Sequence, residues 1–217
     1  MKSRALLILL LSFLLADLVL IASGLQEFRW WTKPFLMPIL LGYFWFLTIE
    51  KKKIRNNYLI FAILFSFLGD VFLLFQNGIL FGLAEFLLAH IFYCLIFYRK
   101  KQGNRRFDFL AVILIYLIFL LSFLWNSLGS MQIPVVVYAL TVATMLYFAL
   151  CTKNRLLAVG ALLFVISDSA LSVELFKHQA VFLRLLVMLT YVLGQLFLVK
   201  GIVETSKAIT TQNVCEQ

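Results

Sequence analysis

Long apolar runs alternate with short polar breaks along almost the whole chain. Most runs approach the roughly 20 residues that a helix needs to cross a ~30 Å hydrocarbon core. Because lipid offers the backbone no hydrogen-bond partner, each run is predicted to be a helix. The predicted spans are residues 5–23, 35–49, 59–75, 79–98, 109–125, 133–150, 156–175 and 181–203. The pattern predicts an all-α polytopic membrane bundle of eight transmembrane helices. The short run 35–49 spans only if it begins near Lys33 and Pro34 or if the bilayer thins locally.

Composition removes the alternative of a soluble enzyme. The 217 residues are 64% hydrophobic and only 13% charged, with a mean hydropathy of +1.01. A soluble domain would carry about a quarter charged residues. The predicted spans leave no room for a separate catalytic domain, so we expect one transmembrane domain over 1–217, with a short polar tail at 208–217. Any chemistry must therefore lie among the spans.

The positions of the basic residues predict the orientation of the spans. With eight crossings and a cytoplasmic N-terminus, only Arg29, Lys33, Lys177 and Arg184 fall on the outer side. The remaining 15 of the 19 basic residues fall on the cytoplasmic side, which predicts that both termini are cytoplasmic. This distribution explains the net charge of +9, so we expect no nucleic-acid partner. Compact loops and a first run without a clear cleavage site favour a bacterial inner (cell) membrane.

A weak internal repeat suggests how the bundle is built. Without gaps, residues 64–70 align with 162–168, and Tyr93 then aligns with Tyr191. The alignment predicts two four-helix halves, 1–100 and 101–207, in parallel orientation. The alternative is chance similarity between segments rich in Leu and Phe. If the repeat is real, Asp70 and Asp168 lie at equivalent depths and can face each other across a pseudo-two-fold axis.

Polar residues recur at helical spacing in four of the spans. A charged group that faces lipid costs several kcal/mol, so Asp70 and Asp168 should face the bundle interior. The four stripes consist of Ile63, Ser66 and Asp70; Gly82, Phe86, His90, Tyr93 and Phe97; Gly160, Phe164, Asp168 and Leu171, with Ser167 adjacent; and Arg184, Met188, Tyr191 and Gln195. A bundle that joins these stripes is predicted to hold a polar cavity at mid-depth. The alternative is that the polar side chains only hydrogen-bond packed helices together.

The other ionisable residues in the spans are weaker candidates. We expect structural roles for Asp17, which should be half solvated, and for Glu174. Glu85 suits either an access path or an ion pair with Arg184. His90 and two Asp could in principle bind zinc, but such sites need three or four ligands, and we expect no metal and no cofactor.

Five motifs occur in order from the second span to the last. They are Lys33-Pro34-x-x-Met37-Pro38, Ser66-x-x-Gly69-Asp70, Phe81-Gly82-Leu83-x-x-Phe86-Leu87-x-x-His90-x-x-Tyr93, Gly160-Ala161-x-x-Phe164-x-x-Ser167-Asp168 and Tyr191-x-x-x-Gln195. The ordered set resembles the YhhN/TMEM86 family of lysoplasmalogenases. The resemblance implies an eight-span hydrolase that cleaves the vinyl ether bond of lysoplasmalogens. Its products would be a fatty aldehyde and glycerophosphoethanolamine or glycerophosphocholine, and its partners the lysophospholipid substrate and membrane lipids.

The chemistry suits the residues independently. Vinyl ether hydrolysis begins with a proton on the β-carbon, which leaves an oxocarbenium ion that water captures. The reaction needs a protonated acid and a second carboxylate, much as in glycosidases. Burial in a low dielectric raises the pKa of an Asp, and two carboxyl groups close together push their pKa values apart, so one can be protonated while the other is ionised. Asp70 and Asp168 are the predicted catalytic pair, with neither assigned as acid or base. Residues predicted to bind or orient the substrate are Lys33, Ser66, His90, Tyr93, Tyr138, Ser167, Tyr191 and Gln195.

Two alternatives remain at this point. Lys33 lies near a span end, where it suits either a contact with the head-group phosphate or an interfacial anchor. A parallel repeat with acids near the midplane also suits a proton-coupled transporter of small solutes or lipids.

Overall fold

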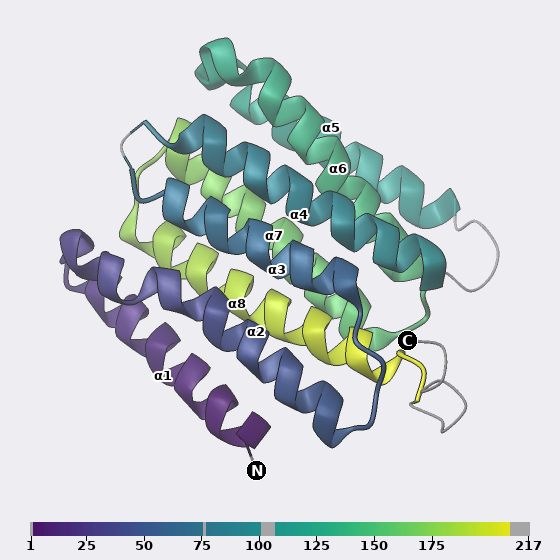
Figure 1. Cartoon of the computed structure of the whole chain (residues 1–217). Helices are drawn as coiled ribbons and strands as arrows, with labels where there is room; N and C mark the ends of the chain where they lie inside the picture. Colours follow the sequence, from purple (N-terminus) through teal and green to yellow (C-terminus); the bar gives the residue numbers. More distant parts are fainter. Residues whose placement is uncertain (1, 76, 101–106, 209–217) are drawn as a thin grey trace.

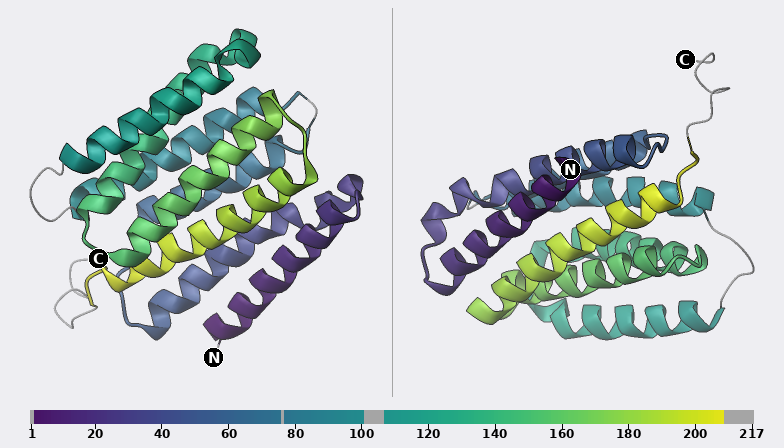
Figure 2. Two further views of the ribbon diagram at one scale, coloured as in Figure 1. Left: turned by 180° about the vertical axis from the view of Figure 1, so that it is seen from behind. Right: turned by 90° about the horizontal axis from the view of Figure 1, so that it is seen from below.

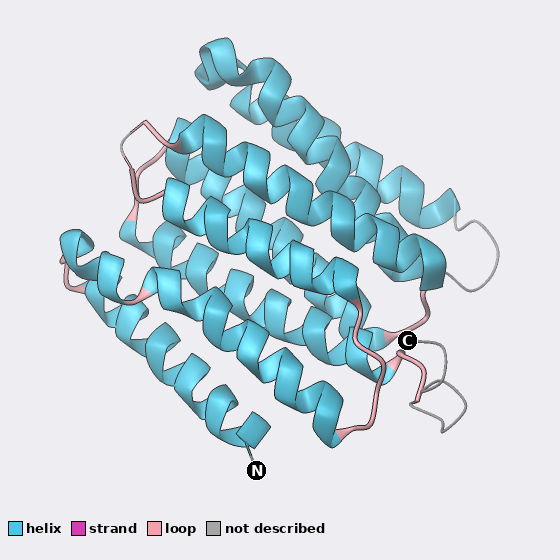
Figure 3. Cartoon of the chain, viewed as in Figure 1, coloured by secondary structure: helices cyan, strands magenta, loops and turns pink. Residues whose placement is uncertain are grey.

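The computed structural model describes residues 2–75, 77–100 and 107–208, and nearly all of them are helical (Figures 1 and 3). The α-helices are α1 (Lys2–Ala22), α2 (Lys33–Glu50), α3 (Asn57–Phe72), α4 (Ile79–Lys100), α5 (Phe107–Leu128), α6 (Gln132–Cys151), α7 (Arg155–Phe176) and α8 (Val181–Glu204). The prediction of an all-helical bundle is confirmed. Residues 209–217 of the predicted tail, and Lys101, Arg105 and Arg106, lie outside the described residues.

Local chemistry explains the differences from the predicted ends. Helix α2 begins at Lys33 rather than at residue 35, with Pro34 in its first turn, where proline needs no hydrogen-bonded N–H. A 3₁₀ helix, η1 (Gln26–Trp31), occupies a segment expected to be a loop. Helix α3 ends at Phe72 instead of residue 75, and the chain then turns back so tightly that a Cβ on Gly78 would overlap the Phe72 carbonyl oxygen.

Six segments of the described chain are long and apolar enough to cross a membrane. They are Lys2–Ala22, Gln26–Glu50, Ile79–Lys100, Asp108–Cys151, Arg155–Phe176 and Val181–Glu204. The 44-residue segment Asp108–Cys151 contains α6 and all of α5 except its first residue, and the apolar helix α3 has only 16 residues. On α5, Val112, Ile115 and Phe119 are 65%, 68% and 70% exposed, which suits contact with lipid. The fold is that of a multi-pass membrane bundle.

The helices lie side by side, with α1 at one edge and α5 at the opposite edge (Figures 1 and 2). Helix α7 packs along α8, and α3 packs along α4. Helix α2 bridges α3 and α8, while α6 bridges α4 and α7. The helices that carry the polar stripes therefore lie in the middle of the bundle.

The pair α7 and α8 approaches unusually closely. A Cβ on Gly160 would lie 2.6 Å from Leu198 Cδ2 and 3.0 Å from the carbonyl oxygen of Gly194. Small residues allow such approach between membrane helices, where packing rather than water exclusion holds helices together. This contact fixes the depth of the α7 residues against those of α8.

Helices α3 and α7 begin in the same way. The side chain of Asn56 accepts from the Tyr58 N–H at 3.0 Å, and that of Asn154 accepts from the Leu157 N–H at 3.1 Å. Both are N-caps, a position that favours Asn because its side chain satisfies a free N–H. Asp70 and Asp168 each follow their cap by 14 residues, so they stand at the same position along their helices.

Candidate functional site

The first buried cluster forms around Asp70, which is 2% exposed. Its Oδ1 lies 3.4 Å from Lys33 Nζ, and its Oδ2 accepts a 2.8 Å hydrogen bond from the Tyr191 hydroxyl. These three residues come from α3, α2 and α8. A carboxylate buried in this way needs such donors, since an unpaired buried charge is strongly unfavourable.

A hydrogen-bonded chain links three of the polar stripes nearby. The Tyr93 hydroxyl donates to Gln195 Oε1, and Gln195 Nε2 donates to Ser66 Oγ at 2.9 Å. All three side chains are buried. The chain joins α3, α4 and α8 and holds Gln195 one helical turn from Tyr191, so it fixes the face of α8 that meets Asp70.

The second cluster pairs Asp168 on α7 with His90 on α4. His90 Nδ1 lies 2.6 Å from the carbonyl oxygen of Phe86, and because a carbonyl only accepts, Nδ1 must carry a proton. His90 Nε2 then faces Asp168 Oδ2 at 3.4 Å, and both atoms are buried without another hydrogen-bond partner. If His90 were neutral and Asp168 ionised, the lone pair of Nε2 would face a lone pair of Oδ2, and the two would repel each other. The geometry therefore favours a proton held between His90 and Asp168.

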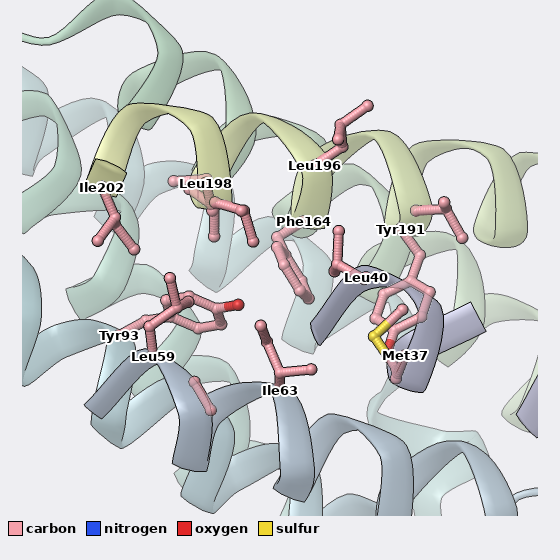
Figure 4. Close-up of a cluster of buried hydrophobic side chains, with 14 of the residues drawn as sticks. Met37, Leu40, Leu59, Ile63, Tyr93, Phe164, Tyr191, Leu196, Leu198 and Ile202 are labelled. Atoms are coloured by element: carbon pink, nitrogen blue, oxygen red, sulfur yellow. The ribbon is translucent and has the colours of Figure 1, made fainter. Parts of the chain in front are cut away.

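Aromatic rings connect the two clusters. The Phe164 ring lies edge-on to His90, at 5.1 Å between centroids, and edge-on to Tyr191 at 5.6 Å. Figure 4 shows Phe164 among the buried side chains beside Tyr93 and Tyr191. Within the described residues no hydrogen bond or ion pair joins Asp70 to Asp168. In the described part of the chain the two aspartates thus have separate partners, and Tyr191, Phe164 and His90 lie between them.

An apolar cavity of about 300 Å³ lies on the other side of Asp168. It is walled by α5, α6 and α7, through residues such as Leu117, Val142 and Val165. Asp168 is the only charged residue among the described residues that line it. Its wall includes Val112 and Leu162, which are 65% and 49% exposed, so the cavity reaches the outer surface of the bundle.

This cavity differs from the polar, mid-depth cavity predicted between the stripes. Apart from Tyr138, the residues that α5 and α6 contribute were not predicted. Most are aliphatic, so nothing in their chemistry separates them from lipid-facing residues. The ring of Tyr138 lies edge-on to His90 at 5.4 Å between centroids and also lines the cavity.

Lys33 and Ser167, which were predicted to bind or orient the substrate, both contact other helices. Lys33 is 6% exposed and pairs with Asp70, so it is not an exposed interfacial anchor. Ser167 Oγ donates to the Val187 carbonyl oxygen at 3.1 Å, which ties α7 to α8.

The weaker ionisable candidates form their own contacts. Asp17 is fully buried rather than half solvated, because η1 places Arg29 against it, at 3.0 Å from Arg29 Nη2 to Asp17 Oδ2. Arg184 pairs with Glu174 at 2.7 Å, not with Glu85. Glu85 Oε2 is buried without a hydrogen-bond partner. These ion pairs join residues from different helices, so the spacing of residues along one helix could not predict them.

In the part of the chain that the structure describes, no group of three His, Cys, Asp or Glu side chains is placed as a metal site requires. His90 and Asp168 alone offer two such groups side by side. A metal would therefore need further ligands from water or substrate.

Fold and site together define a multi-pass α-helical membrane protein with ionisable groups buried among its helices. Comparison with protein families matches residues 28–202 to the YhhN family, and the chain belongs to that family. It is 34% identical over 140 residues to rat (Rattus norvegicus) lysoplasmalogenase TMEM86B, a match that covers 63% of this chain and 58% of the rat protein.

Other relatives agree. The pig (Sus scrofa) lysoplasmalogenase TMEM86B is 31% identical over 146 residues, covering 67% of this chain and 63% of the pig protein. The cattle (Bos taurus) lysoplasmalogenase TMEM86A is 29% identical over 161 residues, covering 68% and 66% of the two chains. The chain thus spans less than two thirds of the length of each of these TMEM86 relatives. No solved structure matches it.

Proposed function

We propose that this chain is a membrane hydrolase that cleaves the vinyl ether bond of lysoplasmalogens. The names of the relatives support the substrate class. The observation that carries the proposal is the pairing of His90 with Asp168, at 3.4 Å, at the wall of an apolar cavity. An acid next to a site for a hydrocarbon chain suits protonation of a vinyl ether.

The proposed reaction begins with Asp168. Its carboxyl group gives a proton to the β-carbon of the vinyl ether, and the double bond becomes an oxocarbenium ion. Water adds to that ion and loses a proton, which leaves a hemiacetal. The hemiacetal collapses to a fatty aldehyde and releases glycerophosphoethanolamine or glycerophosphocholine. His90 Nε2 accepts the proton that water loses and returns it to Asp168 for the next cycle.

Asp70 is the second carboxyl group in this proposal. Its negative charge stabilises the cation, one role of the second carboxylate in related glycoside chemistry. Lys33 and Tyr191 hold it in place by the contacts described above. Ser66, Tyr93 and Gln195 keep the stripe of α8 in register with α3, and Tyr138 and Ser167 orient the groups around Asp168.

The substrate chain would enter from the bilayer. Val112 and Leu162 place the cavity wall at the lipid-facing surface, so a hydrocarbon chain can enter without crossing water. The vinyl ether, at the polar end of that chain, would then lie against Asp168.

We also propose eight crossings, with both termini in the cytoplasm of a bacterial cell and two parallel halves. The equal placement of the Asn56 and Asn154 caps supports the repeat. So do the contacts of α2 with α8 and of α4 with α6, which are equivalent under it. Alkaline phosphatase fused after residue 77 or 178 should be active, and fused after residue 153 inactive. The reverse pattern would contradict this topology.

The test of activity uses the purified full-length chain with a lysoplasmenyl lipid and with the matched acyl lysophospholipid. Free aldehyde should appear only from the first, with or without a chelator. Loss of activity with chelator would show that a metal takes part. Uptake of labelled solute into proteoliposomes without aldehyde release would instead favour a transporter.

A further inference from the structure

A second cavity, of about 620 Å³, lies at the end of the bundle where α4 and α8 end and α3 begins. Its described lining consists of Ile54, Arg55, Asn56, Asn57, Tyr58, Ile96, Arg99, Lys100, Thr152, Thr205, Ser206 and Lys207. Four of these residues are basic and none is acidic. The cavity shares no lining residue with the clusters of Asp70 and Asp168 or with the apolar cavity.

The basic side chains are positioned by neutral partners. Arg99 Nη2 donates to the Tyr58 hydroxyl at 2.9 Å, and the Arg99 guanidinium lies 4.6 Å from the centroid of the Tyr58 ring. Lys100 Nζ donates to Thr205 Oγ1 at 2.8 Å. Lys53 Nζ donates to the Ser206 carbonyl oxygen at 2.8 Å and adds a fifth positive charge beside the cavity.

The described ion pair at this end of the bundle, between Lys51 and Glu204, does not neutralise the basic side chains that line the cavity. Lys51 Nζ lies 3.8 Å from Glu204 Oε1, and both side chains are nearly half exposed. Neither residue lines the cavity. Several cations that converge without a counter-charge repel one another, and a bound anion relieves that repulsion.

The preference of basic residues for the cytoplasmic side of a membrane does not by itself explain why these side chains meet in one cavity. The positive-inside rule is satisfied by lysines and arginines anywhere in short loops. Here Arg55, Lys100 and Lys207 come from three separate segments of the chain and meet in one cavity. Arginine and lysine donors together with amide and hydroxyl groups match the oxygen atoms of a phosphate group.

We propose that this cavity binds the phosphate group of a ligand, carried either by a lipid head group or by a soluble phosphate compound. Arg99 would offer its guanidinium to two phosphate oxygens, while Lys100, Arg55 and Lys207 supply further positive charge. Asn57 lies in the same lining, and its side-chain amide can donate to a remaining phosphate oxygen.

The test measures binding without turnover, so its result is independent of any hydrolase activity. The purified full-length chain is heated in neutral detergent with inorganic phosphate, against chloride at equal ionic strength. A second arm uses nanodiscs of phosphatidylcholine with and without phosphatidylglycerol, and native mass spectrometry counts retained phosphatidylglycerol. The variants are Arg99→Gln with Lys100→Gln and, in case that pair unfolds, Arg55→Gln with Lys207→Gln. The control is Lys51→Gln with Lys52→Gln, which removes equal charge outside the cavity.

Phosphate should raise the unfolding temperature of the wild type and of the control in a saturable way. Each cavity variant lacks two charge-assisted contacts, so it should bind phosphate about 100-fold more weakly, about tenfold for each contact. Stabilisation by phosphate points to a soluble ligand, while retention of phosphatidylglycerol alone points to a lipid head group. Equal losses in the control and the cavity variants would show diffuse surface charge and overturn the proposal. So would a wild type that responds to neither ligand.

Discussion

His90 Nε2 and Asp168 Oδ2 face each other at 3.4 Å, and neither atom has another hydrogen-bond partner. The other ring nitrogen of His90 is already committed to the Phe86 carbonyl oxygen. A proton shared by this pair would lie at the edge of an apolar cavity, because Asp168 also lines that cavity.

Asp168→Asn and Asp70→Asn should each abolish aldehyde release while the protein remains folded. An amide keeps the shape of the carboxyl group but can neither transfer its proton nor carry its negative charge, and a positioned acid or base contributes on the order of 100-fold or more. The matched control is Asp108→Asn, on the exposed first turn of α5, which should keep wild-type activity. Full activity in either site variant would rule out the carboxyl mechanism.

His90→Gln should lower kcat by about 10- to 100-fold, less than the full effect of removing an acid–base group. Asp168 keeps its place at the cavity but loses the partner that holds the proton. KM should change little, because the apolar cavity is untouched. A variant in which KM rises while kcat stays constant would assign His90 to substrate binding instead.

Ala143→Phe should fill the apolar cavity between α5, α6 and α7. A bulky ring there competes with the substrate chain, so KM for a long-chain lysoplasmalogen should rise about tenfold or more. A short-chain substrate should be affected less. Leu140→Phe, on an exposed part of the same helix that does not line the cavity, serves as the control. Equal effects of both substitutions on KM would show that the hydrocarbon chain of the substrate does not bind in this cavity.

Gly160→Ala should destabilise the fold by about 1–3 kcal/mol, the usual effect of overpacking. The new methyl group would meet the Leu198 side chain and the Gly194 carbonyl oxygen and push α7 away from α8. Gly42→Ala is the comparison, since its Cβ would meet Leu6 at an ordinary 3.5 Å. That change should leave stability equal or raise it by up to about 1 kcal/mol through helix propensity. Unfolding of both in denaturing detergent measures the difference.

Asp17→Asn should destabilise the protein by about 3–5 kcal/mol, because it leaves Arg29 without its buried counter-charge. Adding Arg29→Gln should recover part of the loss, since the double variant buries no unpaired charge. A double-mutant cycle of unfolding free energies measures the coupling. Additive effects of the two changes would show that the pair does not stabilise the fold.

The number and approximate positions of the α-helices could be predicted from the apolar runs in the sequence. The run predicted at 181–203 is α8, Val181–Glu204, since an apolar run bounded by polar breaks has one stable form in lipid. Helix ends depend on finer chemistry. The tight turn at Gly78 and the 3₁₀ helix η1 arise from how neighbouring segments meet, which periodicity along one helix does not contain.

The sequence alone places Asp70, His90, Asp168 and Tyr191 on interior helix faces, because each polar group in a span must avoid lipid. It does not say which helices adjoin. Only the tertiary structure pairs Asp70 with Lys33 and Tyr191, pairs Asp168 with His90, and opens an apolar cavity at Asp168. The reason is physical: helical periodicity sets the direction of a side chain, while its partner is decided by packing between helices distant in sequence.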